Sequence, residues 1–159
     1  MRAAIVTVST SKARGDGVDE SGERLALFAT GIGAVIAGRD LIPDHRGLIA
    51  QRLRHWADAE CCHLILTTGG TGFSPTDVTP EATRAVIERE APGLAEAMRA
   101  ASREHTPHWM LSRGIAGIRD QSLILNFPGS PRAIDQAGEA IREALPHALD
   151  LIADRPAGH

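Results

Sequence analysis

A glycine-rich segment is the clearest candidate for chemistry in this chain. It reads TTGGTG over Thr67–Gly72 and begins with the last two residues of the apolar run His63–Thr68. Closely spaced glycines let a backbone turn tightly and bring its N–H groups near an oxyanion, and threonine hydroxyls add donors. The segment is not a Walker A loop or a dinucleotide-binding fingerprint, because neither spacing is present. Its composition favours a phosphate cradle, with a tight surface turn as the alternative; the candidate binding residues are Thr68, Gly69, Gly70, Thr71 and Gly72.

Two aspartates follow predicted strand ends and could bring a cation to such a cradle. Asp77 lies in FSPTDVTP after the glycine segment, and Asp44 follows LIP. Mg²⁺ takes carboxylate and phosphate oxygens together, so two convergent carboxylates beside a phosphate cradle predict a magnesium–nucleotide site. Each aspartate also has a simpler interpretation. Asp44 could cap a helix, and Asp77 could cap a helix or make a local turn.

The segment NFPGSP repeats the arrangement of strand, glycine turn and helix start. Ser130 followed by Pro131 predicts a helix cap, and the free N–H groups of that helix start could bind an anion. Asn126 offers both a donor and an acceptor, which suits recognition of a heterocycle edge.

Two other loops are weaker candidates. The polar segment Gly15–Gly22 is either a flexible connection or a ligand rim, and Ser21 is a possible cap for the helix that follows. Arg113 lies beside Ser112 in a loop, where an arginine could clamp a phosphate or simply be solvated. Both loops therefore keep two interpretations.

The elements that must position these loops follow from short apolar runs alternating with helical patterns. Such alternation predicts a mainly parallel α/β sheet, and ligands of such sheets bind beyond the carboxyl ends of the strands. We predict one domain over residues 1–153 with a frayed tail at 154–159, folded as a three-layer sandwich with helices on both faces of a twisted sheet plus a small β-hairpin. The predicted strands are Ala3–Val8, Ala34–Ile42, His63–Thr68, and the hairpin pair Ile115–Arg119 and Ser122–Asn126.

Helix starts are expected at four polar residues. Ser21 and Asp44 are possible caps of the first two helices, and Thr79 precedes Pro80 in a helix expected to end near Pro92. Another helix is predicted over Gly93–Ser102. The last helix begins at Ser130-Pro131 and should be kinked or broken by its internal proline, Pro146.

Composition excludes several classes of protein. The chain has 159 residues, 43% of them hydrophobic, and a net charge of −3, which argues against a broad nucleic-acid surface. No apolar run approaches the roughly 20 residues of a membrane span, and the N-terminus lacks the pattern of a secretory signal. We therefore expect a cytoplasmic protein.

Cysteine and histidine usage points away from a metal site with cysteine or histidine ligands and away from covalent catalysis. Cys61 and Cys62 are adjacent, so they cannot form a disulfide framework, and we expect two buried thiols. The histidines lack metal-ligand spacing, and we take His105 and His108 to be surface residues. No nucleophile–base arrangement supports a covalent mechanism.

The combination of TTGGTG, DVTPEAT and NFPGSP, preceded by IPD and DESG, resembles the MogA/MoaB family of molybdenum cofactor biosynthesis proteins. The similarity extends from Val6 to about Leu151. It implies a twisted, mainly parallel sheet, usually in a homotrimer. It also implies binding of molybdopterin and, in adenylylating members, Mg²⁺-dependent transfer of an adenylyl group from ATP to its terminal phosphate, possible hand-over to a molybdenum-insertase protein, and no nucleic-acid or membrane partner.

The resemblance assigns roles to residues at matching positions. Asp44 and Asp77 correspond to the family's two acidic positions and would be the catalytic, magnesium-binding pair. The substrate- and nucleotide-binding positions would be the glycine segment together with Ser9, Asp19, Ser21, Gly22, Glu81, Ser112, Arg113, Asn126, Pro128, Gly129 and Ser130. A non-catalytic molybdopterin carrier of the MoaB type is the alternative function.

Overall fold

The computed structural model describes residues 1–154 and contains one six-stranded sheet in the order β2-β1-β3-β6-β5-β4. Four adjacent strands, β2, β1, β3 and β6, run parallel, whereas β5 and then β4 are added beyond β6 with antiparallel pairing. The strands are β1 (Arg2–Val8), β2 (Val35–Ile42), β3 (Leu64–Thr68), β4 (Arg89–Glu90), β5 (Ala116–Arg119) and β6 (Ser122–Phe127).

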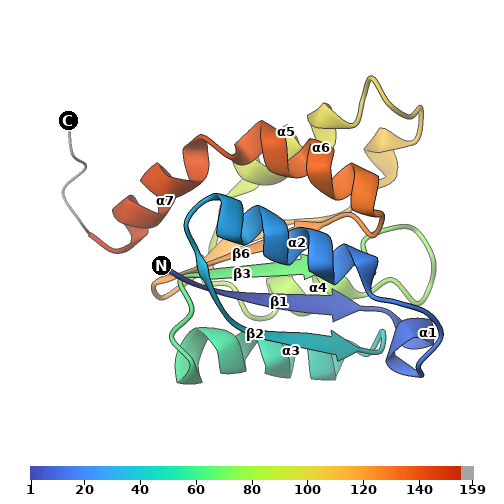
Figure 1. Ribbon diagram of the computed structural model, residues 1–159, viewed down its shortest axis with the longest axis horizontal. Coiled ribbons are helices and arrows are strands. Elements are labelled where there is room, and N and C mark those ends of the chain that lie inside the picture. Colours follow the sequence, from blue (N-terminus) through green and yellow to red (C-terminus); the bar gives the residue numbers. More distant parts are fainter. Residues whose placement is uncertain (155–159) are drawn as a thin grey trace.

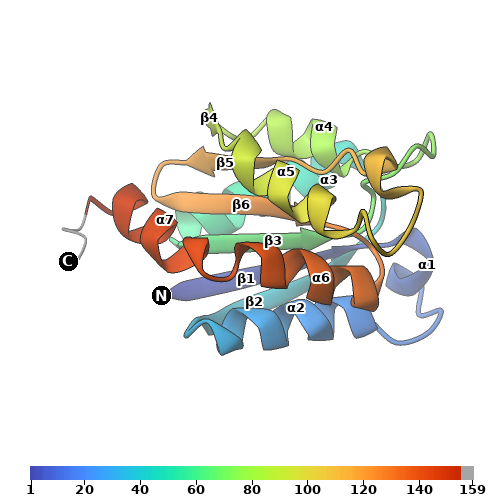
Figure 2. The ribbon, with the colours of Figure 1, turned by 90° about the horizontal axis from the view of Figure 1, so that it is seen from above.

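Helices cover both faces of this sheet, as predicted (Figures 1 and 2). One face carries α2 (Glu20–Gly31), α5 (Pro92–Ala101), α6 (Pro131–Ile141) and α7 (Ala144–Ile152), and the other carries α3 (Arg46–Arg54) and α4 (Thr79–Arg84). The short α1 (Thr10–Ala13), a π-helical turn η1 (His55–Ala59) and a 3₁₀ turn η2 (Trp109–Leu111) complete the described elements.

Alternation along the buried strands divides the core into two layers. Ile5 and Leu66 point to the layer that contains Phe28, Ile134 and other residues of α2, α5 and α6. Their neighbours in sequence point to the opposite layer, which α3 and α4 cover. Because successive strand residues face opposite sides, these continuous apolar runs require helices on both faces. The helices in turn fix the strand ends where the candidate site lies.

The predicted hairpin forms, and it extends the main sheet. Arg119 pairs with Ser122, and Asp120 in the turn adopts a positive φ of 47°. β4 then pairs with β5, where the sequence had predicted that the helix before Pro92 would continue. That helix instead ends at Arg84.

The last predicted helix is broken into two, as its internal proline indicated. α6 ends at Ile141, and Pro146 lies in the first turn of α7, where a missing N–H is tolerated. The predicted frayed tail, 154–159, lies outside the described residues except for Asp154. In the described part of the chain, no helix is long and apolar enough to cross a membrane.

Candidate functional site

The glycine loop between β3 and α4 has a conformation that only glycine fits. Gly69 and Gly70 have φ values of +91° and +65°. A Cβ atom on Gly69 would collide with the carbonyl oxygen of Val8, the last residue of β1, and one on Gly70 would collide with Thr79 Oγ1. The backbone therefore passes close to the neighbouring strand and to α4, which is the close approach that the glycines had suggested.

Thr79 fastens this loop. Its N–H donates to Gly70 O over 3.1 Å, and its Oγ1 donates to Gly69 O over 2.9 Å. The sequence predicted Thr79 as a helix cap, which is wrong, because Val78 occupies the cap position and makes no side-chain cap bond. The Thr79 hydroxyl instead reaches back to the glycine loop, so it contributes to the site and not to the helix end.

The carboxylate of Asp44 borders the glycine loop. A Cβ on Gly70 would lie 3.2 Å from Asp44 Oδ1. Asp44 Oδ2 accepts hydrogen bonds from Thr10 N (3.0 Å) and Thr10 Oγ1 (2.8 Å), which fix the carboxylate. Asp44 does not cap α3, because His45 does so by accepting from Leu48 N. Of the two interpretations offered by the sequence, helix capping is therefore excluded for Asp44.

Asp77 borders the same loop at its other end. A Cβ on Gly72 would lie 2.8 Å from Asp77 Oδ2, and this oxygen accepts from Ser74 N over 3.1 Å. Asp77 therefore makes the local turn that the sequence offered as one alternative, while its carboxylate still faces Gly72. A local turn and a ligand role are compatible, because one carboxylate has several acceptor positions.

These two carboxylates have the chemistry that a magnesium ion requires. Both border the glycine loop, and within residues 1–154 neither Asp44 Oδ1 nor Asp77 Oδ1 makes a hydrogen bond. The described residues contain no cluster of three or more His, Cys, Asp or Glu side chains arranged for a metal. The pair of Asp44 and Asp77 carboxylates fits Mg²⁺, which is commonly held by one or two carboxylates while phosphate and water oxygens complete its coordination.

Arg113 connects the glycine loop to Asp77 and α4. Its Nε donates to Gly72 O (2.7 Å), its Nη2 donates to Asp77 O (2.8 Å), and it forms an ion pair with Glu81. Its own N–H donates to Thr71 O over 2.8 Å. The sequence had offered a phosphate clamp or a solvated arginine, and the guanidinium instead binds protein groups. The hydrogen bond from Arg113 lowers the pKa of Glu81 below its ordinary value.

The amino end of α2 contacts the NFPGSP loop. Asp19, not Ser21, caps α2 by accepting from Gly22 N over 2.9 Å, which corrects the predicted cap. Ser21 is buried inside the helix, and its hydroxyl donates to Gly129 O over 2.7 Å. Asp19 also accepts from Thr7 Oγ1 at 2.8 Å. These residues position the loop, and their predicted contact with a ligand stays a prediction.

The NFPGSP loop also lies against the glycine loop. Thr68 Oγ1 donates to Pro128 O over 2.7 Å, and a Cβ on Gly129 would lie 3.6 Å from Gly69 Cα. Ser130 caps α6 as predicted, accepting from Ala133 N over 3.2 Å. The ends of β1, β2, β3 and β6 therefore meet at one place, in agreement with the rule that ligands bind at this edge of a parallel sheet.

Asn126 is committed to the protein interior. Its Nδ2 donates to Thr67 Oγ1 (3.0 Å) and Thr83 Oγ1 (2.9 Å), and its Oδ1 accepts from Ile115 N (3.2 Å). Both amide hydrogens are used, and the side chain is buried. The amide therefore joins β3, β6, α4 and the start of β5, and the donor that was predicted to face a heterocycle is occupied.

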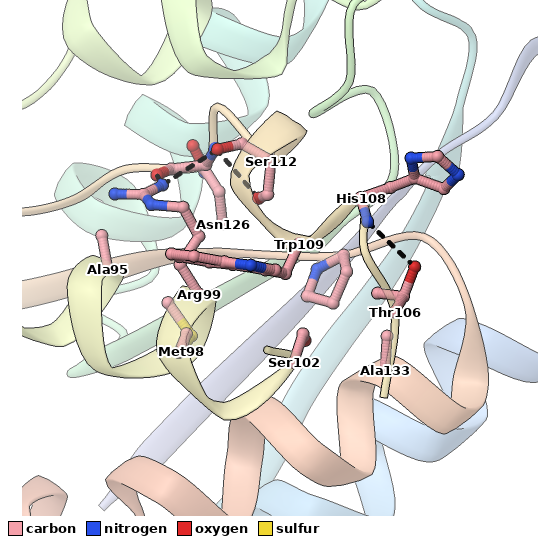
Figure 3. A pocket seen from close by; sticks show the side chains of 12 residues that line it. Ala95, Met98, Arg99, Ser102, Thr106, His108, Trp109, Ser112, Asn126 and Ala133 are labelled. Carbon is pink, nitrogen blue, oxygen red and sulfur yellow. Dashed lines mark hydrogen bonds between the residues drawn. The ribbon is translucent and has the colours of Figure 1, made fainter. Parts of the chain in front are cut away.

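A pocket of about 150 Å³ opens beside these loops (Figure 3). Arg99 Nη1 donates to the carbonyl oxygens of Ser112 (3.1 Å) and Gly114 (2.8 Å) at its wall. The Trp109 ring lies among the lining side chains, with the Arg103 guanidinium 5.9 Å from its centre. The wall combines α5, the 102–114 segment and the end of β6, through residues that include Met98, Arg99, Trp109, Ser112 and Pro128.

Sequence reasoning missed several contributors to this site. Thr10, Thr79, Arg99 and Trp109 were not singled out as site residues, although each contacts a predicted site residue or lines the pocket. Trp109 carried the strongest signal, because aromatic residues make up only 3% of the chain and it lies between the helix predicted over Gly93–Ser102 and the predicted hairpin. The contacts of Thr10 and Arg99 gave no local signal.

The fold and the converging loops define a known class of domain. The family model described as "Probable molybdopterin binding domain" matches residues 4–147, and the chain belongs to this family. The resemblance to MogA and MoaB proteins is thereby confirmed. The crystal structure of the molybdopterin biosynthesis enzyme MoaB from Thermus thermophilus superposes with a TM-score of 0.91 at 45% identity, covering 99% of both chains.

Two curated relatives are similar to this chain in sequence. The molybdopterin adenylyltransferase of Haemophilus influenzae is 45% identical over 124 residues, which cover 70% of this chain and 63% of that protein. The molybdenum cofactor synthesis protein cinnamon of Drosophila melanogaster is 48% identical over 115 residues, covering 72% of this chain and 19% of that protein. The chain thus spans less than two thirds of the length of either relative.

Proposed function

We propose that this protein adenylylates molybdopterin with Mg-ATP during assembly of the molybdenum cofactor. The proposal rests on one observation: the carboxylates of Asp44 and Asp77 border a glycine loop whose positive φ values and close contacts leave no space for side chains at Gly69 and Gly70. The curated relative from Haemophilus influenzae is named for this activity and is 45% identical over the aligned region.

The glycine loop and the two aspartates would hold the nucleotide. Backbone N–H groups in Gly69–Gly72 would bind phosphate oxygens, and Asp44 and Asp77 would hold Mg²⁺. When bound, this ion supplies charge neutralisation at the reacting phosphates. We propose the same ligand-binding role for the surrounding residues that the resemblance indicates, namely Ser9, Asp19, Ser21, Gly22, Ser112, Pro128, Gly129 and Ser130.

The pocket beside Ser112 would take the pyranopterin of molybdopterin. Its wall is largely apolar and includes the Trp109 ring and Met98, whereas Ser112 and Arg99 contribute polar groups. A pocket with an apolar lining and a few polar groups is typical of a small-molecule site, and the aromatic ring could pack against the planar pyrimidine part of the ligand. Its position beside the glycine loop would bring the terminal phosphate of the substrate toward the nucleotide.

The reaction requires positioning more than a covalent catalyst. A phosphate oxygen of molybdopterin would form a bond to the α-phosphorus of ATP, and the bond from that phosphorus to the oxygen bridging to the β-phosphate would break. Pyrophosphate then leaves with the electron pair. The attacking phosphate carries negative charge near pH 7, since its second pKa is about 6, so no strong general base is needed.

Product formation tests this proposal directly. Purified protein incubated with molybdopterin and Mg-ATP should yield adenylylated molybdopterin and pyrophosphate in equal amounts. Molybdopterin that binds tightly, with no effect of ATP and no pyrophosphate, would contradict the proposal and support the alternative of a non-catalytic carrier.

We also propose a homotrimer and hand-over of the product to a molybdenum-insertase protein, as the family resemblance implies. Sedimentation equilibrium should give three times the chain mass of 16.9 kDa. A monomer at micromolar concentration would contradict the trimer without affecting the proposed reaction.

A further inference from the structure

The guanidinium of Arg113 closes a loop whose two ends are at the candidate metal site. It donates to Gly72 O over 2.7 Å and to Asp77 O over 2.8 Å. Residues 73–76 between these carbonyls form a tip in which Phe73 is exposed. Within the tip, Asp77 N donates to Ser74 O and Ser74 N donates to Asp77 Oδ2, so its internal bonds are few and local.

Glu81 fixes the guanidinium in this orientation. It lies in the first turn of α4 and binds Arg113 through both carboxylate oxygens. All three side-chain nitrogens of Arg113 therefore have protein acceptors, namely Gly72 O, Asp77 O and the Glu81 carboxylate. An arginine that clamped a phosphate through two N–H groups would have to give up at least one of these bonds, because four of the five N–H groups of the guanidinium already have protein acceptors.

We propose that Arg113, oriented by Glu81, is a positioning residue that holds the Asp77 segment in place for metal binding and does not itself contact the substrate. This inference rests on the proposed function for its metal. Arg113 acts through the main chain of Gly72 and Asp77, so its loss should loosen the segment and weaken the metal site. Groups that orient metal ligands typically contribute about 10–100-fold to metal affinity.

The contacts on either side of Arg113 extend this role to the pocket. Arg99 holds the carbonyl oxygens of Ser112 and Gly114, while Arg113 between them binds the glycine loop. The segment 112–114 therefore joins the pocket wall to the metal site through hydrogen bonds on both sides. From this position Arg113 holds the Asp77 segment through hydrogen bonds to main-chain oxygens, and this role requires no contact with phosphate.

The first test measures how strongly Arg113 stabilises residues 73–78, and it needs no ligand. Hydrogen exchange of the backbone amides of residues 73–78 is compared in wild type, Arg113→Gln and Arg119→Gln. Arg119 is a matched control, because its Nε and Nη2 bind the Asp58 carboxylate and its Nη1 donates to Val86 O, and these bonds involve neither the glycine loop nor the segment 73–78. We expect exchange in 73–78 to rise about tenfold or more in Arg113→Gln only.

The second test measures the affinity of the site for a divalent metal ion. Mn²⁺ replaces Mg²⁺ as a paramagnetic probe, and its binding in the presence of a non-hydrolysable ATP analogue is followed by electron paramagnetic resonance. We expect about tenfold weaker Mn²⁺ binding in Arg113→Gln, an intermediate value in Arg113→Lys, and wild-type binding in Arg119→Gln. Glu81→Gln should weaken binding less than Arg113→Gln, because the carbonyl bonds of the guanidinium remain.

Kinetics separates positioning from substrate contact. For Arg113→Gln we expect a raised Mg²⁺ requirement and a largely restored kcat at saturating Mg²⁺, with an unchanged KM for ATP. Unchanged exchange in 73–78, or normal Mn²⁺ binding combined with a raised KM for ATP, would overturn the positioning role. If exchange rises as expected but wild type forms no adenylylated product, the proposed function fails while the structural hold of Arg113 stands.

Discussion

At the scale of single residues, the glycine loop is the segment in which added side-chain atoms should be most destabilising. Gly69→Ala should lower the free energy of unfolding by about 3 kcal/mol, because it adds a collision with Val8 O to a positive-φ conformation. Gly15→Ala is the matched control, since Gly15 also has a positive φ, of +95°, but open space around its Cβ position. We expect that control to lose about 1 kcal/mol in urea denaturation. Equal losses would show that the close approach to β1 is not restrictive.

The two cysteines should differ in reactivity, although the sequence predicted that both are buried. Cys61 is exposed, with a positive φ of 50°, whereas Cys62 is buried in the core. Burial raises the pKa of the Cys62 thiol, which lowers its thiolate fraction. A colorimetric thiol reagent should modify one cysteine rapidly in the folded protein and the second only after unfolding. Rapid modification of two thiols, or loss of the fast thiol in Cys62→Ala, would contradict this assignment.

At the scale of elements, Asn126 is the residue that joins most of them. Asn126→Ala should lower the free energy of unfolding by about 3 kcal/mol, because it leaves Ile115 N and two threonine hydroxyls without their buried partner. Ser130→Ala, which removes an exposed helix cap, should lose only about 1 kcal/mol. Thermal or urea denaturation compares the two, and similar losses would exclude a central role for the amide.

A second link between elements should depend on pH. Arg119 binds the Asp58 carboxylate across 2.7–2.8 Å and joins β5 to η1, and this bond lowers the pKa of Asp58. Because the folded pKa lies below the unfolded value of about 3.9, the stabilisation is complete above that value and disappears as the pH falls through the folded pKa. Asp58→Asn should therefore be less stable than wild type at pH 7, by about 0.5–1 kcal/mol.

The same comparison in acid provides the check. Urea denaturation at pH 7 and at about pH 3 should show the difference between Asp58→Asn and wild type shrinking on acidification. A difference that stayed constant or grew toward low pH would contradict the link between Asp58 ionisation and stability.

Strands were easier to predict from sequence than helix starts. Continuous β-branched runs such as Ala3–Val8 have few alternatives, whereas a polar residue before a helix can serve elsewhere. Ser21 and Thr79 were both predicted as caps, and both hydroxyls instead bind carbonyl oxygens of a site loop. At these positions the tertiary contact replaced the local one, and local spacing does not carry that information.

The candidate site was predictable in part for the same reason. The glycine loop and Asp44 follow strand ends in the sequence, Asp77 lies five residues beyond Gly72, and in the structure both carboxylates border the glycine loop. The hydrogen bonds that fix these groups were not predictable, because they join positions that are far apart in the sequence. Arg113 lies 41 residues from Gly72 and Asp44 lies 34 residues from Thr10, so no local pattern records either contact.

At the scale of the whole molecule, the parallel strands gather the candidate chemistry at one edge. The glycine loop, both aspartates and the NFPGSP loop lie there, and the pocket adjoins them through the segment 112–114. Helices on both faces hold this edge in place, since α2 and α4 each contact a site loop through a buried hydroxyl. The sheet therefore provides a rigid support for loops that must position two substrates.

The most direct test of the proposed reaction is single-turnover conversion of molybdopterin with Mg-ATP, comparing wild type with Asp77→Asn. Asp58→Asn, a carboxylate removed at the opposite end of the strands, serves as the control. We predict adenylylated product from wild type and the control, and a rate lower by several orders of magnitude in Asp77→Asn. Equal rates in wild type and Asp77→Asn, or no product from wild type with molybdopterin still bound, would contradict catalysis through a carboxylate-held magnesium ion.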